Sequence, residues 1–137
     1  MTQPAGYSGK PLATKLGLAA GMRVAVLGAP EGFSDDLQAT TDAALTPRLR
    51  KGIDMAVVFV TARRDLERRW PALTDACAPN GAVWVAWPKR ASGKRTDMTE
   101  DVVREVVLPT GWVDTKVCAV DATWSGLKCV LRRSLRG

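Results

Sequence analysis

The sequence predicts a three-layer α/β domain, in which a mainly parallel sheet lies between two layers of helices and ends in a C-terminal antiparallel hairpin. The prediction depends on three short, continuously apolar runs at residues 24–27, 57–60 and 82–87. Strands that are buried on both faces of a parallel sheet have this pattern. Helical patterns between the runs supply right-handed crossovers, which place helices on both faces. We expect 24–27 and 57–60 to be adjacent at the centre of the sheet, with 83–87 next.

The chain of 137 residues is long enough for one hydrophobic core. Hydrophobic residues make up 46% and charged residues 25%, as in an average globular protein. We expect residues 1–9 to be a flexible N-terminus and residues 10–137 to form a single domain, with a first short helix opened by Pro11. No apolar run suits a membrane span or a signal peptide, so we expect a cytoplasmic protein with no membrane partner.

The first expected strand is followed by a turn at residues 28–32 (GAPEG). Ser34, Asp35 and Asp36 then have the residue types of a helix start, because acidic side chains favour the positive end of a helix dipole. Pro47 and Gly52 interrupt the chain between this helix start and the second strand. The sequence assigns no further element between residues 33 and 53.

The second expected strand leads into a helix that Thr61 is expected to cap, with an apolar face that runs from Leu66 to Cys77. Pro71 lacks the amide of a helical residue and is expected to kink or restart this helix. Residues 79–81 (PNG) are expected to end it, just before the third strand.

Asp97 and Glu100 have the spacing of a capping box, which predicts a further helix after Asp97. Residues 112–121 and 127–132 are then expected to form the final hairpin. A pairing centred between Thr123 and Trp124 places Cys118 opposite Cys129, two thiols that we expect to stay reduced.

The chain contains no histidine, and this excludes several classes of site. Without an imidazole there is no Ser-His-Asp or Cys-His nucleophile system and no His-ligated metal. The three cysteines, Cys77, Cys118 and Cys129, lack the CxxC spacing of a zinc site, so we expect buried thiols and no metal. Acid–base chemistry would need carboxylates, lysine, tyrosine or cysteine.

Two sets of segments carry a resemblance to known proteins. The run LGLAAGMRV at 16–24, which leads to Gly28, resembles the entry to strand one of class I S-adenosylmethionine-dependent methyltransferases, and the PNG turn at 79–81 resembles the turn before their fifth strand. The segments at 29–32, 84–89, 96–104 and 114–127 are similar to a bacterial family of small proteins with no established activity. Both resemblances imply a Rossmann-like, methyltransferase-like fold.

The sequence departs from the methyltransferase pattern at the cofactor loop. Val26 stands where the resemblance places an acid, and Pro30 stands where it places the middle glycine, although proline removes an amide and fixes φ. Only 25 residues separate Gly28 from Asp54, whereas two further strand–helix units take roughly 50 at the ~30 residues of a βαβ unit. The strand that carries the ribose-binding carboxylate in that family is therefore expected to be truncated or absent, and we expect no cofactor.

Open parallel sheets bind ligands beyond the carboxyl ends of their strands, which selects the loops at 28–32, 61–64 and 87–96. We expect these loops to bring cations and helix N-termini to one rim, with tryptophans as flat apolar walls. The alternative is a solvated basic loop with ordinary core tryptophans. Arg64 is expected on the same rim. The candidate ligand-binding residues are Glu31, Arg63, Trp87, Lys89, Arg90, Lys94, Arg95, Asp97 and Trp124.

The formal net charge of +6 suits anionic partners. Three function classes remain open. The first is a non-enzymatic domain that binds an anionic small molecule or an acidic partner. The second is a degenerate or atypical methyltransferase-related enzyme, or one that uses Glu31 or Asp97 as its carboxylate. The third is an accessory protein that associates with nucleic acid or with other copies of itself, without sequence-specific recognition.

Overall fold

The computed structural model describes residues 11–136, so the expectation for residues 1–9 lies outside the described residues. None of the helices in this part of the chain has the length and apolarity needed to cross a membrane. The elements are α1 (Leu12–Leu16), β1 (Arg23–Leu27), α2 (Phe33–Gln38), β2 (Ala44–Thr46), β3 (Ile53–Phe59), α3 (Arg63–Ala76), β4 (Cys77–Pro88), η1 (Arg90–Ser92), α4 (Glu100–Val107), η2 (Leu108–Thr110), β5 (Trp112–Ala119), β6 (Trp124–Leu131) and η3 (Arg133–Leu135).

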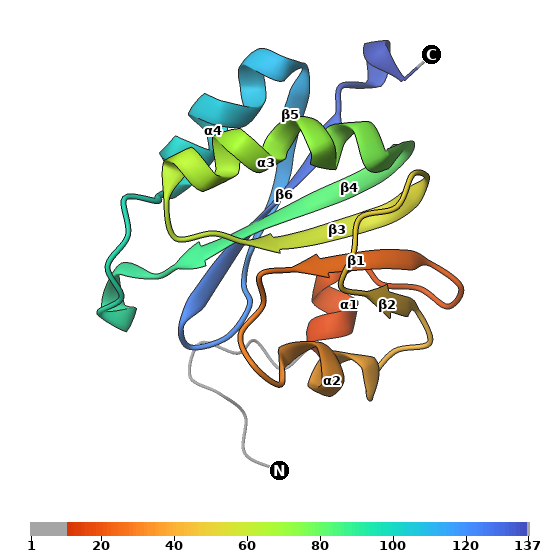
Figure 1. Cartoon of the computed structure of the whole chain (residues 1–137), viewed down its shortest axis with the longest axis horizontal. Coiled ribbons are helices and arrows are strands. Elements are labelled where there is room, and N and C mark those ends of the chain that lie inside the picture. Colours follow the sequence, from red (N-terminus) through yellow and green to blue (C-terminus); the bar gives the residue numbers. More distant parts are fainter. Residues whose placement is uncertain (1–10, 137) are drawn as a thin grey trace.

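The strands form one sheet in the order β2-β1-β3-β4-β6-β5 (Figure 1). The first four strands in that order are parallel, whereas β6 runs antiparallel to both β4 and β5. Helices α3 and α4 cover one face, and α1 and α2 lie on the other. The predicted fold class is therefore confirmed, with β1 and β3 adjacent at the centre, β4 next to them and the hairpin at one edge.

The apolar runs are continuous because each central strand contributes side chains to the hydrophobic cores on both faces of the sheet. In β4, Val83, Val85 and Trp87 pack under α3 and α4, whereas Trp84 and Ala86 pack on the opposite face of the sheet. The side chains of a strand point alternately to the two faces, so both faces need apolar residues. This alternation decides on which face of the sheet each tryptophan packs.

The segment at 33–53, in which the sequence predicts only a helix start at residues 34–36, contains α2 and the three-residue strand β2. β2 pairs parallel with β1, and the amide of Ala44 donates a hydrogen bond of 2.8 Å to the carbonyl of Met22. No helix lies between β2 and β3 in the described chain. The sheet is shortened after β1, as expected, and its second strand is truncated.

The residues expected to separate α3 from the third strand lie within that strand instead. β4 begins at Cys77, where the backbone turns directly from helical to extended dihedral angles, and residues 79–81 form an irregular stretch of β4. Gly81 is needed here, because a Cβ atom would lie 2.7 Å from the carbonyl oxygen of Asp54. α3 runs through Pro71, which lies on its exposed side and does not restart the helix.

The predicted register of the hairpin is wrong. Cys118 lies opposite Gly126, and Cys129 lies opposite Asp114. The turn is shifted because Asp121 Oδ1 accepts hydrogen bonds of 2.8 Å from the amides of Thr123 and Trp124, and a register irregularity follows between Asp114 and Lys116. All three cysteines are free. Burial raises the pKa of Cys77 to about 11 and that of Cys129 to about 12, so these thiols are protonated near neutral pH.

Candidate functional site

The carboxyl ends of β1, β3 and β4 lie at the same edge of the sheet, where ligands of open α/β sheets bind. Pockets lie at this edge, and two of them follow the loops that the sequence selects. One, of about 310 Å³, follows β1, and the other, of about 370 Å³, follows β4. Both volumes are within the range of small-molecule sites. We call them the β1 pocket and the β4 pocket.

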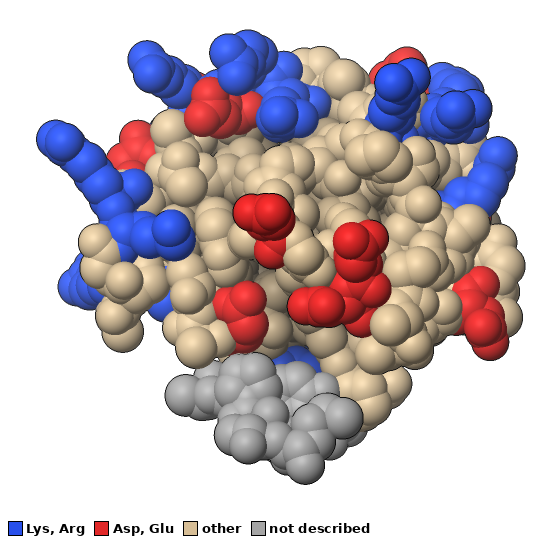
Figure 2. Space-filling view, turned by 60° about the horizontal axis from the view of Figure 1, so that its bottom comes forward, with Lys and Arg blue, Asp and Glu red and all other residues tan. Residues whose placement is uncertain are grey.

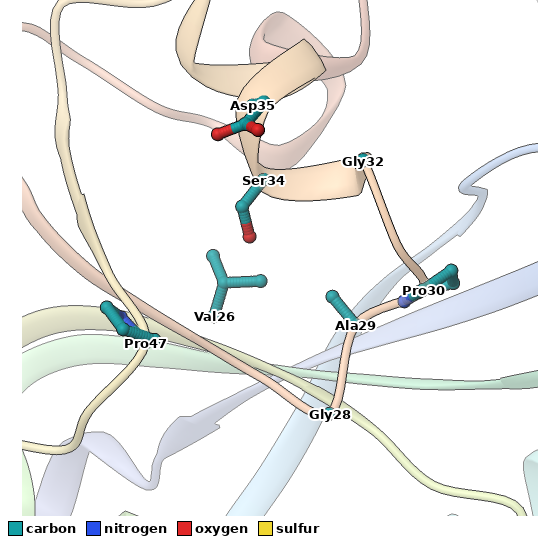
Figure 3. Close-up of a pocket in the computed structure, with 8 residues that line it drawn as sticks. All are labelled: Val26, Gly28, Ala29, Pro30, Gly32, Ser34, Asp35 and Pro47. Carbon is teal, nitrogen blue, oxygen red and sulfur yellow. The ribbon is translucent and has the colours of Figure 1, made fainter.

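The β1 pocket lies between the loop after β1 and the first turn of α2 (Figure 3). Ser34 points its hydroxyl group into the pocket, toward Val26, and Asp35 contributes a carboxylate near its upper wall. Lysine and arginine are absent from its lining in the described residues. The pocket therefore offers hydrogen-bonding and acidic groups but no charge that would attract an anion.

The surface around α2 has the same acidic character. Asp35 and Asp36 lie in the first turn of α2. Figure 2 brings the lower part of Figure 1 forward and shows acidic side chains near the middle of that face, with lysines and arginines along its upper and left margins. Glu31 is exposed in the loop after β1 and does not line the pocket.

The β4 pocket has both apolar and charged walls. Trp87 and Met98 are almost fully buried and supply apolar surface, whereas Arg90 and Lys94 supply cations from the loop that follows β4. Neither cationic side chain makes a hydrogen bond or ion pair with any residue of the range 11–136. The remaining lining residues are Pro88, Thr96, Thr99 and Glu100.

Hydrogen bonds hold the loop of the β4 pocket in place. At its start, the amide of Lys89 donates to the carbonyl of Thr123 over 2.7 Å. In the middle, Ser92 Oγ donates to the carbonyl of Lys89 over 2.6 Å and accepts from the amide of Lys94 over 3.2 Å. At its end, Thr96 Oγ1 donates to the carbonyl of Thr61 over 2.6 Å. The cations are thus carried by a loop tied to the hairpin and to the end of β3.

Arg63, a predicted rim cation, is already paired. Its guanidinium forms ion pairs with Glu67 and with Glu105, and hydrogen bonds to these two carboxylates raise its pKa. Two carboxylates around one guanidinium leave no positive charge for a ligand. Lys89 and Arg95 lie on the same loop as Arg90 and Lys94 but do not line the pocket.

Asp97 caps α3 rather than α4. Its Oδ1 accepts a hydrogen bond of 2.7 Å from the amide of Arg63, the first residue of α3. The residue before α3 is Ala62, so Thr61 is not its cap, and α4 is capped by Thr99, whose Oγ1 accepts from the amide of Val102 over 3.1 Å. The capping-box interpretation of Asp97 is therefore wrong.

The two tryptophans do not form walls of one site. Trp87 faces the core under α3 and α4, whereas Trp124 lies in the core on the opposite face of the sheet. There its ring meets Phe59 edge-on at a centroid distance of 5.0 Å. Trp124 is paired with Pro88, the neighbour of Trp87 in the strand, and neighbouring strand residues point to opposite faces.

The structure adds Met98, Thr99 and Glu100 to the residues expected from the sequence. In the sequence, Thr99 followed by two acidic residues also indicates a helix start, and this start is the one that α4 uses instead of Asp97. In the described chain, no three His, Cys, Asp or Glu side chains are grouped to hold a metal ion.

No protein-family model matches the chain, and no curated protein matches it. Solved structures do. An S-adenosylmethionine-dependent methyltransferase from Aquifex aeolicus has a TM-score of 0.61 at 13% identity, with 86% of each chain covered. A putative type 11 methyltransferase from Sulfolobus solfataricus has a TM-score of 0.61 at 10% identity, covering 84% of this chain and 86% of that one. Magnesium protoporphyrin IX methyltransferase from Synechocystis has a TM-score of 0.57 at 10% identity, covering 87% and 78%.

At these identities the likeness shows the fold alone. The chain has the Rossmann-like fold of S-adenosylmethionine-dependent methyltransferases, with a truncated second strand and the C-terminal antiparallel strands present.

Proposed function

We propose that the protein binds an anionic small molecule in the β4 pocket without catalysing a reaction on it. The observation that supports this most directly is the pair of cations, Arg90 and Lys94, on the wall of a pocket whose other walls include the apolar side chains of Trp87 and Met98. Such a pocket suits an anion that carries an apolar body.

The strength of binding depends on several cations acting together. Two opposite charges about 4 Å apart interact by roughly 4 kcal/mol at an effective dielectric constant near 20, but salt screens exposed charges over about 8–10 Å. Arg90 and Lys94 are exposed, so each contributes far less than that figure. Lys89 and Arg95 lie on the same loop and add to the positive field around the pocket.

The variant K89A/R90A/K94A tests the proposal with phenyl phosphate, a probe that has both an aromatic body and a phosphate. We expect binding to weaken at least about five-fold and to depend less on salt, because the variant removes both cations that line the pocket and a third from the same loop. The melting temperature should hardly change, since surface substitutions typically alter stability by less than about 0.5 kcal/mol each. Titration followed by tryptophan fluorescence, at several salt concentrations, measures binding.

The control R69A/R132A/R133A removes the same formal charge from exposed arginines that do not line the β4 pocket. It should bind phenyl phosphate like the original protein. Equal weakening in both variants would mean that net charge, and not the pocket, attracts the anion.

The fold makes a methyltransferase-related enzyme the second candidate, so the fit of S-adenosylmethionine to the β1 pocket matters. The residues there do not fit the family's pattern. Val26, which is buried and apolar, stands at the position where the family has an acid. β2 ends at Thr46 and is followed by Pro47, so the second strand brings no carboxylate to the pocket. Asp35 lines the pocket, but it comes from α2 rather than from the second strand. Pro30 has no backbone N–H to donate within the loop.

We therefore expect S-adenosylmethionine to bind the protein only weakly. Isothermal titration calorimetry at micromolar protein concentration should give little heat, because the chain lacks the acid at position 26, a carboxylate from the second strand and the glycine that the pattern places at position 30. A low-micromolar dissociation constant, or a crystal structure with the cofactor in the β1 pocket, would overturn this prediction and favour the enzyme.

A further inference from the structure

The lining of the β4 pocket includes charged side chains of both signs. The loop after β4 contributes Arg90 and Lys94, and the first turn of α4 contributes Glu100. A pocket for a simple polyanion has no use for a carboxylate in its wall, because the carboxylate repels a second negative group. The charge of Glu100 therefore bears on what kind of anion the pocket accepts.

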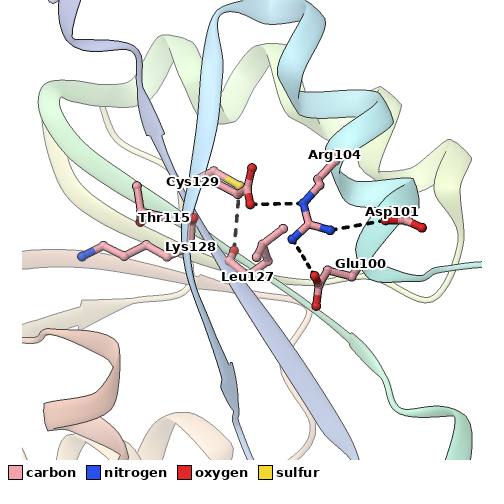
Figure 4. Close-up of polar contacts among 8 residues, drawn as sticks. Glu100, Asp101, Arg104, Thr115, Leu127, Lys128 and Cys129 are labelled. Atoms are coloured by element: carbon pink, nitrogen blue, oxygen red, sulfur yellow. Dashed lines mark hydrogen bonds and ion pairs between the residues drawn. The ribbon is translucent and has the colours of Figure 1, made fainter.

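The partner of Glu100 does not neutralise it. Arg104 forms ion pairs with three carboxylates, those of Glu100, Asp101 at 3.3 Å and Asp114 at 3.1 Å. Dashed lines in Figure 4 join its guanidinium to the labelled carboxylates of Glu100 and Asp101. One positive charge is thus shared among three negative ones. Glu100 uses Oε2 for this contact, and its Oε1 bonds to no residue of the described range. With 43% of its side chain exposed, Glu100 is accessible to a ligand.

Resting on the proposed anion site, we propose that the anionic group bound there is the carboxylate of a zwitterion of the amino-acid type with a large apolar side chain. Its carboxylate faces Arg90 and Lys94, its ammonium group faces Glu100, and its apolar side chain lies against Trp87 and Met98. Each charged residue of the pocket then lies against a ligand group of opposite charge, and each apolar residue lies against an apolar part of the ligand. A ligand with two or more negative groups loses affinity to the repulsion by Glu100.

Two probes that differ by one group test this proposal. Phenylalanine and 3-phenylpropionate share the same aromatic ring and carboxylate, and only phenylalanine has the ammonium group. We expect phenylalanine to bind about two- to five-fold more tightly, the range expected for one half-exposed ion pair. Glu100→Gln should abolish this preference while leaving the affinity for 3-phenylpropionate equal or higher. Calorimetry or a fluorescence titration at low salt gives the four dissociation constants.

The matched control is Asp101→Asn. Asp101 lies in the same turn of α4 and contacts the same guanidinium, but it does not line the pocket. This variant loses the same charge and a similar contact, so it reports any effect that acts only through Arg104 or through stability. The preference for phenylalanine should survive in it.

The outcomes separate this inference from the proposed function. In one outcome, 3-phenylpropionate binds and R90A/K94A weakens its binding, but phenylalanine binds no more tightly, or Glu100→Gln leaves the preference for phenylalanine intact. The ligand is then not a zwitterion, and the anion site stands. If neither probe binds the original protein, or if R90A/K94A changes nothing, the anion site itself is wrong and the inference falls with it.

Discussion

Replacing Trp84 with alanine is expected to lower the free energy of unfolding by about 3–5 kcal/mol, the usual cost of removing a buried tryptophan. Only 1% of Trp84 is exposed. Its ring packs in the same core as Leu16 of α1, and its Nε1 donates a hydrogen bond of 2.9 Å to the carbonyl oxygen of Leu16. The change leaves a cavity beside α1 and removes the donor from a buried carbonyl. Urea unfolding followed by far-ultraviolet circular dichroism measures the loss.

Phenylalanine at position 84 separates the hydrogen bond from most of the packing. Trp84→Phe is expected to cost about 1–3 kcal/mol, because the carbonyl of Leu16 stays buried without its donor. The matched control is Trp124→Phe, since the indole N–H of Trp124 bonds to no residue in the described part of the chain. If Trp84→Phe costs no more than Trp124→Phe, the hydrogen bond to Leu16 does not stabilise the docking of α1.

Gly28→Ala is expected to cost about 2–5 kcal/mol of unfolding free energy. Gly28 has a φ of +69°, a region that costs other residues about 1–2 kcal/mol, and a Cβ atom would lie 2.9 Å from the carbonyl oxygen of Phe59. That oxygen belongs to the backbone of β3 and cannot turn away, so overpacking adds about 1–3 kcal/mol. The measurement is again chemical unfolding, at matched salt and pH.

The loop after β1 supplies its own control in Gly32. This residue has a φ of +83°, but no atom lies within 4 Å of a Cβ placed there. Gly32→Ala should therefore cost only the backbone term of about 1–2 kcal/mol. Equal losses in the two variants would show that β3 can move away from the loop, contrary to the close packing of Gly28 against Phe59.

Local apolar patterns in the sequence predicted the structure best. The runs in β1, β3 and β4 predicted central strands, and the structure places them side by side as expected. β2 was not predicted, because a strand of three residues is too short to show an alternation of apolar and polar side chains. The register of the hairpin was also missed, since hydrogen bonds from Asp121 decide where the turn lies.

The candidate site was predictable only in part. The rule that ligands bind beyond the carboxyl ends of parallel strands selected the loop that carries Arg90 and Lys94, and these residues do line a common pocket with Trp87. The same rule included Arg63, but its ion pair with Glu105 joins residues 42 positions apart. Such pairing depends on how α3 packs beside α4, which residue spacing does not reveal.

The amino-acid sequence by itself determined the fold class, the central strands and the loops at the ligand-binding edge, because these follow from apolar periodicity and chain topology. Only the tertiary structure decided which polar groups of those loops have partners. It assigned Asp97 to the start of α3, placed Trp87 and Trp124 on opposite faces of the sheet, and brought Glu100 into the lining of the same pocket as Arg90. The physical reason is that charge compensation and side-chain direction depend on neighbours distant in sequence, whereas burial of a strand is encoded in its own residues.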